Sequence, residues 1–371
     1  MSSDSPPPTP LPPQQFLPGL RTALQMRLPK SRFRKLLFIG IYLFYCWGLV
    51  VLGIKLFWIW TAGVPLGQEP LTVDFFYSEI RQSQVRERHP RHSDEHFDVL
   101  LLGGSVLTPA WGSVEHCLEE KFHEMAGDRV RIFNLAWPAH TSRDSLIKYW
   151  LVAGEEFDLV IVYDGINDVA MNCCPAEEFR DDYLHFSWYR EVAEAIDTGR
   201  MSLPIRLSDQ VQLVGQGLLR TDIGPQTAEF GREIKTVRTL RRNHEELLST
   251  AAARGDPVLL MTFAYNIPLE AGDQPAAEDG SQESPGERLT CWGKSKYVAA
   301  ALDAQNAAIR GLAESHPDVL FVDQTPLMPE GQGLFNDACH LSTAGSRRFV
   351  ENLWPTVKSR WTEWNASQST K

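Results

Sequence analysis

Three residues of this chain have the types needed for nucleophilic catalysis. Ser105 follows Gly103 and Gly104 directly after an apolar run, and Asp337 precedes His340 by three positions near the other end. A serine hydroxyl is a poor nucleophile until a base takes its proton, and His340 is the candidate base. Asp337 would fix the imidazole tautomer and stabilise the imidazolium. These residue types predict that Ser105 attacks a carbonyl carbon and forms an acyl-enzyme.

The surrounding pattern predicts the elements that position these residues. Short, β-rich apolar runs alternate with longer helical stretches from Phe97 onward. Strands are expected at 98–103, 130–135, 158–164, 257–264 and 319–323, and helices at 113–126, from about 142, at 294–315 and at 342–360. Such alternation predicts about five parallel strands covered by helices on both faces. In sheets of this kind, function collects in the loops at the carboxyl ends of the strands.

The unusual residues lie in those loops. They form the segments Gly103–Ser105, Asn134–Ser142, Asp164–Asp168 and Asp337–His340. Each segment is ambiguous alone, since Gly-Gly-Ser is also typical of a plain turn or a phosphate-binding loop. In this order they resemble the four blocks of the SGNH (GDSL-like) hydrolase superfamily over residues 97–360. The resemblance implies a flavodoxin-like, three-layer α/β/α fold and a serine esterase or acylhydrolase.

The resemblance also assigns a role to each matching position. It implies that Ser105 is the nucleophile and that Asp337 and His340 complete the triad. The N–H of Ser105, the N–H of Ala139 and the side-chain amide of Asn167 would then form the oxyanion hole. Two positions depart from the family pattern. Gly-Gly-Ser replaces Gly-Asp-Ser, and Ala139 stands where the family has a glycine, at a position where a positive φ would be unfavourable for alanine.

The order Ser, Asp, His also occurs in α/β-hydrolases. Those enzymes carry Gly-x-Ser-x-Gly, whereas the position two after Ser105 is Leu107. Nearby residues have less specific interpretations. His140 is expected to be structural, Asp168 to cap a turn, and Cys339 to be a small buried side chain. Trp111 and Trp137 would either pack in the core or stack on sugar rings.

The sequence divides into five regions. Residues 1–35 are predicted to be a disordered, Pro-rich and basic cytoplasmic tail, followed by a transmembrane signal-anchor helix at 36–60. Residues 61–96 are expected to be a membrane-proximal linker. The hydrolase domain is placed at 97–360, with an insertion at about 170–255 that would form a lid or substrate wall. Residues 361–371 are expected to be a flexible tail.

The basic cluster before the apolar run sets the expected orientation. Because cations concentrate before the run and few follow it closely, the N-terminus should remain cytoplasmic and the catalytic domain should be extracytoplasmic. Two alternatives stay open. The run is also compatible with a cleaved signal peptide, although a small-residue cleavage site is only weakly present, or with a buried core helix.

Composition narrows the choice of partners. The formal net charge is −11, which argues against nucleic acid. The six cysteines form no CxxC metal pattern, and no metal or cofactor is predicted. In an oxidising compartment Cys291 could pair with Cys173 or Cys174.

Three functions therefore remain. The chain is a membrane-anchored ester hydrolase acting on an acylated glycan, a lipid or a small ester, an O-acyltransferase on an envelope polysaccharide, or a non-catalytic scaffold of polymer assembly. The first and second share an acyl-enzyme and differ in the acceptor, water or a sugar hydroxyl.

Overall fold

The computed structural model describes residues 30–62, 64–67, 76–91, 95–199, 224–267 and 288–369, with Leu203, Leu207 and Val211. It divides into two units, Met1–Leu66 and Gly67–Lys371. The Pro-rich stretch predicted to be disordered lies outside the described residues.

The first unit contains helix α1 (Lys30–Ala62). Its segment Arg34–Thr61 has a mean hydropathy of 2.2, and none of its most apolar stretch is buried inside the protein. At 1.5 Å per residue, a helix of this length is about 40 Å long, which exceeds the ~30 Å hydrocarbon core of a bilayer. Among the described residues it is the one helix long and apolar enough to cross a membrane.

The second unit is built on a five-stranded sheet. Its strands are β1 (Phe97–Gly103), β2 (Val130–Asn134), β3 (Leu159–Tyr163), β4 (Val258–Met261) and β7 (Leu320–Val322). Their order is β2-β1-β3-β4-β7, and all neighbours are parallel. All five predicted strands and the predicted α/β class are therefore confirmed. Every residue of β1 and β3 is buried, as a sheet covered on both faces requires.

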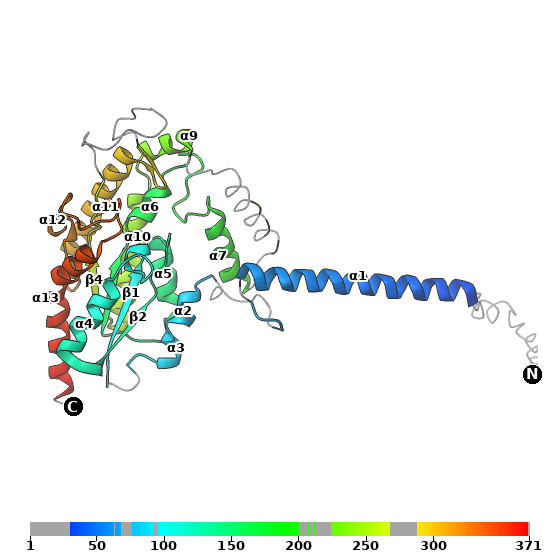
Figure 1. Cartoon of the computed structure of the whole chain (residues 1–371), viewed down its shortest axis with the longest axis horizontal. Helices are drawn as coiled ribbons and strands as arrows, with labels where there is room; N and C mark the ends of the chain where they lie inside the picture. Colours follow the sequence, from blue (N-terminus) through cyan, green and yellow to red (C-terminus); the bar gives the residue numbers. More distant parts are fainter. Residues whose placement is uncertain are drawn as a thin grey trace, which may run out of the picture. The chain divides into compact units, whose positions relative to one another are not determined.

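Helices form a layer on each face of the sheet (Figure 1). The longer ones are α4 (Val114–Ala126), α5 (Ser142–Leu151), α7 (Ser187–Thr198), α10 (Thr236–Arg254), α11 (Ser295–Ser315) and α13 (Thr343–Gln368). α4 packs against α13, whereas α10 packs against both α5 and α11. α10, at the end of the predicted insertion, is thus part of the layer that covers the sheet.

Short elements complete the unit. The short helices are α2 (Ser78–Gln82), α3 (Val85–Arg88), α6 (Ile166–Ala170), α9 (Pro225–Glu229) and α12 (Gln324–Leu327), and the single 3₁₀ turns are η3 (Ser105–Leu107), η4 (Gly127–Arg129) and η5 (Phe230–Arg232). Strands β5 (Leu289–Thr290) and β6 (Gly293–Lys294) form an antiparallel hairpin.

Residues 76–91 differ from the expected linker. Tyr77 and Val85 are fully buried, and the Tyr77 hydroxyl donates to the Asp144 carboxylate at 3.0 Å. At the other end of the segment, Arg91 Nε lies 3.1 Å from Asp158 Oδ1. The neighbouring polar stretch suggested a solvated linker, but the apolar side chains of the segment bury against the domain.

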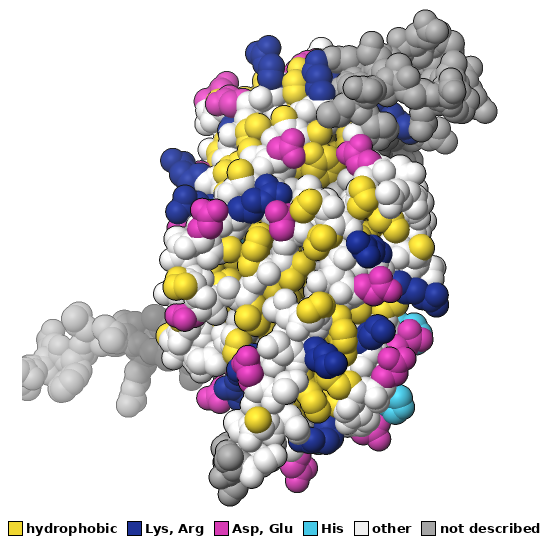
Figure 2. All heavy atoms as spheres, turned by 90° about the vertical axis from the view of Figure 1, so that its left-hand side faces the viewer, with side chains coloured by type: hydrophobic (Ala, Val, Ile, Leu, Met, Phe, Trp, Pro, Cys, Tyr) yellow, Lys and Arg dark blue, Asp and Glu magenta, His cyan; other side chains and the backbone are white. Residues whose placement is uncertain are grey.

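The chain end also differs from the expected flexible tail. α13 continues to Gln368, and Trp364 is only 5% exposed. Its indole lies edge-on to Phe97, with ring centroids 5.6 Å apart, and under the guanidinium of Arg129. Figure 2 shows the side of the molecule on which α13 lies, where acidic and basic side chains are interspersed among apolar ones. The last turns of α13 therefore cover the start of β1.

We expect Trp364→Ala to lower the free energy of unfolding by about 3 kcal/mol, because it removes a buried aromatic side chain and leaves a cavity against Phe97. Thr362→Ala, which changes an exposed side chain two positions away, is the matched control. Urea unfolding of the full chain in detergent, followed by tryptophan fluorescence, measures both. Equal stability of the two variants would mean that the end of α13 contributes nothing to the fold.

Candidate active site

Ser105 lies at the carboxyl end of the central strand β1. The strand ends at Gly103, which pairs with Tyr163 of β3, and Ser105 begins the turn η3. A side chain at Gly103 would collide with the Tyr163 carbonyl oxygen, so the sharp exit of the chain from the sheet depends on this glycine. The turn holds the serine at the strand end that faces the other predicted site residues.

Ser105, His340 and Asp337 form a continuous hydrogen-bonded chain. Ser105 Oγ lies 2.8 Å from His340 Nε2, and His340 Nδ1 lies 2.7 Å from Asp337 Oδ2. With the ring proton on Nδ1 donated to the carboxylate, Nε2 is free to accept the serine proton. The three residues predicted to form the triad are therefore brought together, across 235 positions of sequence between the nucleophile and the base.

Hydrogen bonds between the Asp337 side chain and two backbone N–H groups hold the turn that carries Asp337 and His340. Asp337 Oδ1 accepts the N–H groups of Cys339 at 2.9 Å and of His340 at 2.8 Å. Burial raises the pKa of Asp337, but these two amides and the His340 ring outweigh it, so its pKa lies below the usual value. The acid therefore stays ionised and orients the imidazole.

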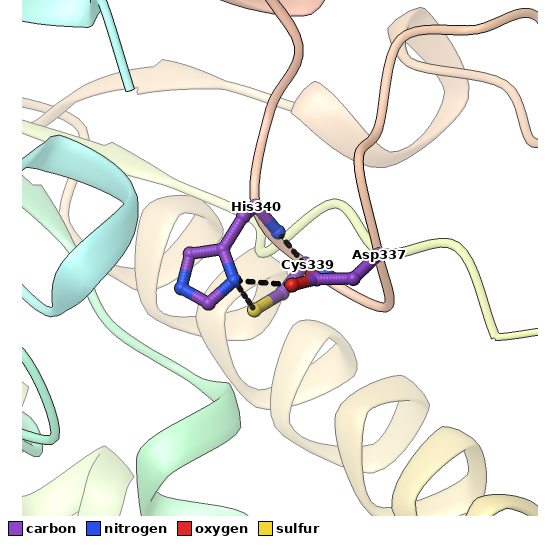
Figure 3. A group of neighbouring side chains, drawn as sticks. All are labelled: Asp337, Cys339 and His340. Carbon is purple, nitrogen blue, oxygen red and sulfur yellow. Dashed lines mark hydrogen bonds and ion pairs between the residues drawn. The ribbon is translucent and has the colours of Figure 1, made fainter. Parts of the chain in front are cut away.

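Asp337, Cys339 and His340 also place three ligand-type atoms within 4.8 Å of one another (Figure 3). His340 Nδ1 points at both the Asp337 carboxylate and, at 3.8 Å, Cys339 Sγ. Burial raises the pKa of the Cys339 thiol, which keeps it protonated and makes it a poor metal ligand. The donor set fits a triad better than a metal centre.

Trp111 stacks on the catalytic imidazole. Its ring centroid lies 4.6 Å from that of His340, with an angle of 24° between the planes, and half of the residue is exposed. An indole face attracts a cation, so the contact favours the imidazolium that forms when Ser105 attacks. The sequence left core packing or sugar stacking open for Trp111, and the structure places its ring on the His340 imidazole.

Ala139 adopts the conformation for which the family uses glycine. Its φ is +64°, in the left-handed region that alanine disfavours. The N–H groups of Ala139 and Ser105 have no acceptor among the described residues. Two backbone donors thus remain available near the nucleophile, as an oxyanion hole requires.

Asn167, the third donor expected from the sequence, lies beside Gly104. Its Nδ2 donates one hydrogen to the His140 carbonyl at 2.8 Å. A Cβ at Gly104 would lie 2.6 Å from the same Nδ2, so Asn167 packs directly against the backbone beside Ser105. In its present position the Asn167 side chain would have to shift if residue 104 carried a side chain.

Trp292 orients the Asn167 amide and was not identified from the sequence. Its Nε1 donates to Asn167 Oδ1 at 3.2 Å, which leaves Nδ2 on the side of His140 and Gly104. The Trp292 carbonyl in turn accepts from the Cys173 thiol at 3.4 Å. Trp292 lies on the β5–β6 hairpin, and no motif in the sequence marks it.

Asp168 is fully buried and supports the start of α5 rather than capping a turn of its own. It accepts the Ser142 N–H at 2.9 Å, the Ser142 hydroxyl at 2.6 Å and the Tyr183 hydroxyl at 2.8 Å. Burial and the nearby Asp164 raise the pKa of Asp168 to about 7. Asp168 therefore joins α6 to the start of α5, instead of the turn cap expected from the sequence.

Comparisons with known proteins found distant structural similarity. No family model matches the chain, and no curated protein matches it. A GDSL-like lipase from Bacteroides thetaiotaomicron is 13% identical, with a TM-score of 0.42, over 76% of this chain and 97% of that one. An acetylxylan esterase from Geobacillus stearothermophilus is 15% identical, with a TM-score of 0.38, over 69% and 93%. At this level of similarity we base function on the site geometry.

We expect Asn167→Ala to lower kcat on an ester by about 100- to 1,000-fold, the usual cost of losing an oxyanion donor. Trp292→Phe keeps an aromatic ring at this position but removes one hydrogen bond to Asn167, so it should lower kcat by only about 2- to 10-fold. Steady-state kinetics on a short-chain aryl ester compares the two with wild type. Full activity of Asn167→Ala would exclude this amide from the oxyanion hole.

Proposed function

We propose that this protein is a serine ester hydrolase that forms an acyl-enzyme on Ser105. The observation that carries the proposal is the unbroken chain from Ser105 Oγ through His340 to Asp337, beside unused N–H groups. Serine, imidazole and carboxylate in this contact order activate a hydroxyl for attack on a carbonyl. The buried serine and histidine, 7% and 8% exposed, keep bulk water away from the proton transfer.

The reaction follows from these contacts. His340 Nε2 takes the Ser105 proton as Oγ attacks the ester carbonyl, and Asp337 stabilises the resulting imidazolium. The donors of Ser105, Ala139 and Asn167 bind the oxyanion. His340 then gives the proton to the leaving alcohol. In the second half, His340 takes a proton from water, which releases the acid and frees Ser105.

The state of Ala139 favours catalysis over a scaffold that has lost its activity. Its departure from the family glycine was the one sequence feature that supported a non-catalytic role. The φ of +64° supports the opposite, because the alanine takes up the glycine-like conformation and keeps its N–H available. A strained residue lowers the stability of the fold, and a scaffold without catalytic activity would gain nothing from keeping it.

We propose an acylated glycan as the substrate class. Trp111 is 50% exposed and Trp137 is 37% exposed. Trp111 stacks on His340, and the Trp137 N–H donates to the carbonyl of Gly103, two residues before the nucleophile. Exposed indoles offer flat apolar faces to sugar rings.

We also propose that the enzyme is anchored in a membrane by α1, with the N-terminus cytoplasmic and the hydrolase unit outside. The length and hydropathy of Arg34–Thr61 support the anchor. The basic residues that precede the apolar run support the orientation. This location fits a substrate in an envelope layer.

We expect purified full-length protein to hydrolyse short-chain aryl esters and Ser105→Ala to lose that activity, because no other described group is placed to attack the carbonyl. Intact-mass spectrometry after quenching should show an acyl adduct on the wild-type protein. Asp337→Asn, which disturbs the imidazole tautomer, should lower kcat by about 10⁴-fold. Equal rates of wild type and Ser105→Ala would refute the proposal.

We expect Trp137→Ala to raise KM for an acetylated oligosaccharide by about 2- to 10-fold, the contribution of one aromatic stacking contact. The same variant should leave KM for a small aryl acetate nearly unchanged, since that ester has no sugar ring. Acetate release from both esters is the measurement. A parallel change on both would argue against a sugar-binding role for this indole.

A further inference from the structure

We propose that Glu79 and Lys148 are positioning residues for the oxyanion hole, and that residues 76–91 therefore complete the active site. The inference rests on the proposed function, because it concerns the loop 135–140 that presents the Ala139 N–H. Glu79 lies on α2, in the stretch that the sequence suggested was a linker, and Lys148 lies on α5.

Lys148 ties together the two ends of this loop. It is fully buried, and its ammonium donates to the Leu135 carbonyl at one end and to His140 Nδ1, at 3.0 Å, at the other. A single side chain thus joins the first residue of the loop, Leu135, to its last, His140. The span between the two contacts is short, so fixing both ends restricts the backbone of Ala139.

Glu79 provides the counter-charge for this buried ammonium. It is 3% exposed, and its Oε1 lies 3.6 Å from Lys148 Nζ and 3.5 Å from His140 Nδ1. Burial lowers the pKa of His140 to about 3, so the ring is neutral and Nδ1 accepts the lysine proton. Without Glu79 the ammonium would be an unpaired charge in the interior, a state that proteins avoid.

Further contacts enclose this group. The rings of Tyr77 and Trp188 lie 5.5 and 5.9 Å from the His140 ring. Tyr77 and Trp188 also donate to Asp144 Oδ1, at 3.0 and 3.1 Å. The Asp144 carboxylate, held by these donors, is a second negative charge that favours the ammonium, after Glu79.

The loop needs this support because its conformation is unfavourable. Ala139, at φ +64°, will leave the left-handed region unless the surrounding structure holds it there. Asn167 holds the His140 carbonyl, and the Gly103 carbonyl accepts from Trp137. Lys148 adds hydrogen bonds on the buried side of the loop. Burial lowers the pKa of Lys148, and the Glu79 carboxylate opposes this lowering. Loss of the pair should turn the Ala139 N–H away from the developing oxyanion.

The test uses the full-length chain and the variant Glu79→Gln/Lys148→Met, which removes both charges together and leaves none unpaired. We expect kcat on an aryl ester to fall by about 10- to 100-fold, part of the cost of losing one oxyanion donor, with KM within about threefold. Glu79→Gln alone should lower kcat less, because the Lys148 amine can still donate to the loop.

Arg91→Gln is the matched control. It breaks another contact of the same segment, the ion pair of Arg91 with Asp158, which immediately precedes β3 at the opposite end of the sheet from Ser105. It should lower stability without lowering kcat. An equal fall of kcat in the control and in the pair variant would mean that the segment acts through stability alone and would overturn the proposal.

A second measurement links the pair to Ala139. Glycine adopts a positive φ without strain, so the pair variant should lose less kcat in an Ala139→Gly background than in the wild-type background. Equal losses in the two backgrounds would show that the pair does not act through this residue.

Amide hydrogen exchange tests whether the pair holds the loop, without any measurement of activity. Exchange in residues 136–141 should speed up in the pair variant and stay unchanged in Arg91→Gln. If wild type cleaves no ester, the proposed function fails, and this measurement still decides whether the pair holds the loop. Unchanged exchange in a folded pair variant would overturn the inference even in an active enzyme.

Discussion

The hydrogen bond from Asn167 to the His140 carbonyl joins the loops that follow three neighbouring strands. Asn167 follows β3, His140 follows β2, and the amide packs against Gly104, which follows β1. This contact holds together the loops that carry Ser105, Ala139 and Asn167. Parallel strands make it possible, because their carboxyl ends meet at one edge of the sheet.

The two departures from the family pattern become understandable around this contact. At Gly104 the Asn167 amide packs against the backbone, in the space that a Cβ would enter. Ala139 keeps a glycine-like φ because its loop is held from several sides. A small residue can replace a family residue when the neighbouring groups supply the lost contact or impose the required conformation.

Asp337 and His140 differ in burial and therefore in charge. Asp337 is partly exposed and receives two backbone N–H groups, so it remains a carboxylate. His140 is buried beside a lysine and stays neutral, which makes it an acceptor within the loop rather than a second base. The structure thus separates His340, whose ring contacts the Ser105 hydroxyl, from His140, whose ring accepts a hydrogen bond from Lys148 within the loop.

The five strands and the three residues Ser105, Asp337 and His340 could be predicted from the sequence. Apolar strands alternating with helices have a local periodicity, and the three residues lie in short segments whose residue types indicate their chemistry. The distant groups that support them became visible with the folded structure. Trp292 reaches Asn167 across 125 positions, and Glu79 enters from a stretch whose polar neighbours suggested a linker. α13 likewise continues through Trp364 because that indole is buried against β1. Such contacts depend on side chains meeting after the chain has folded, and no local pattern encodes them.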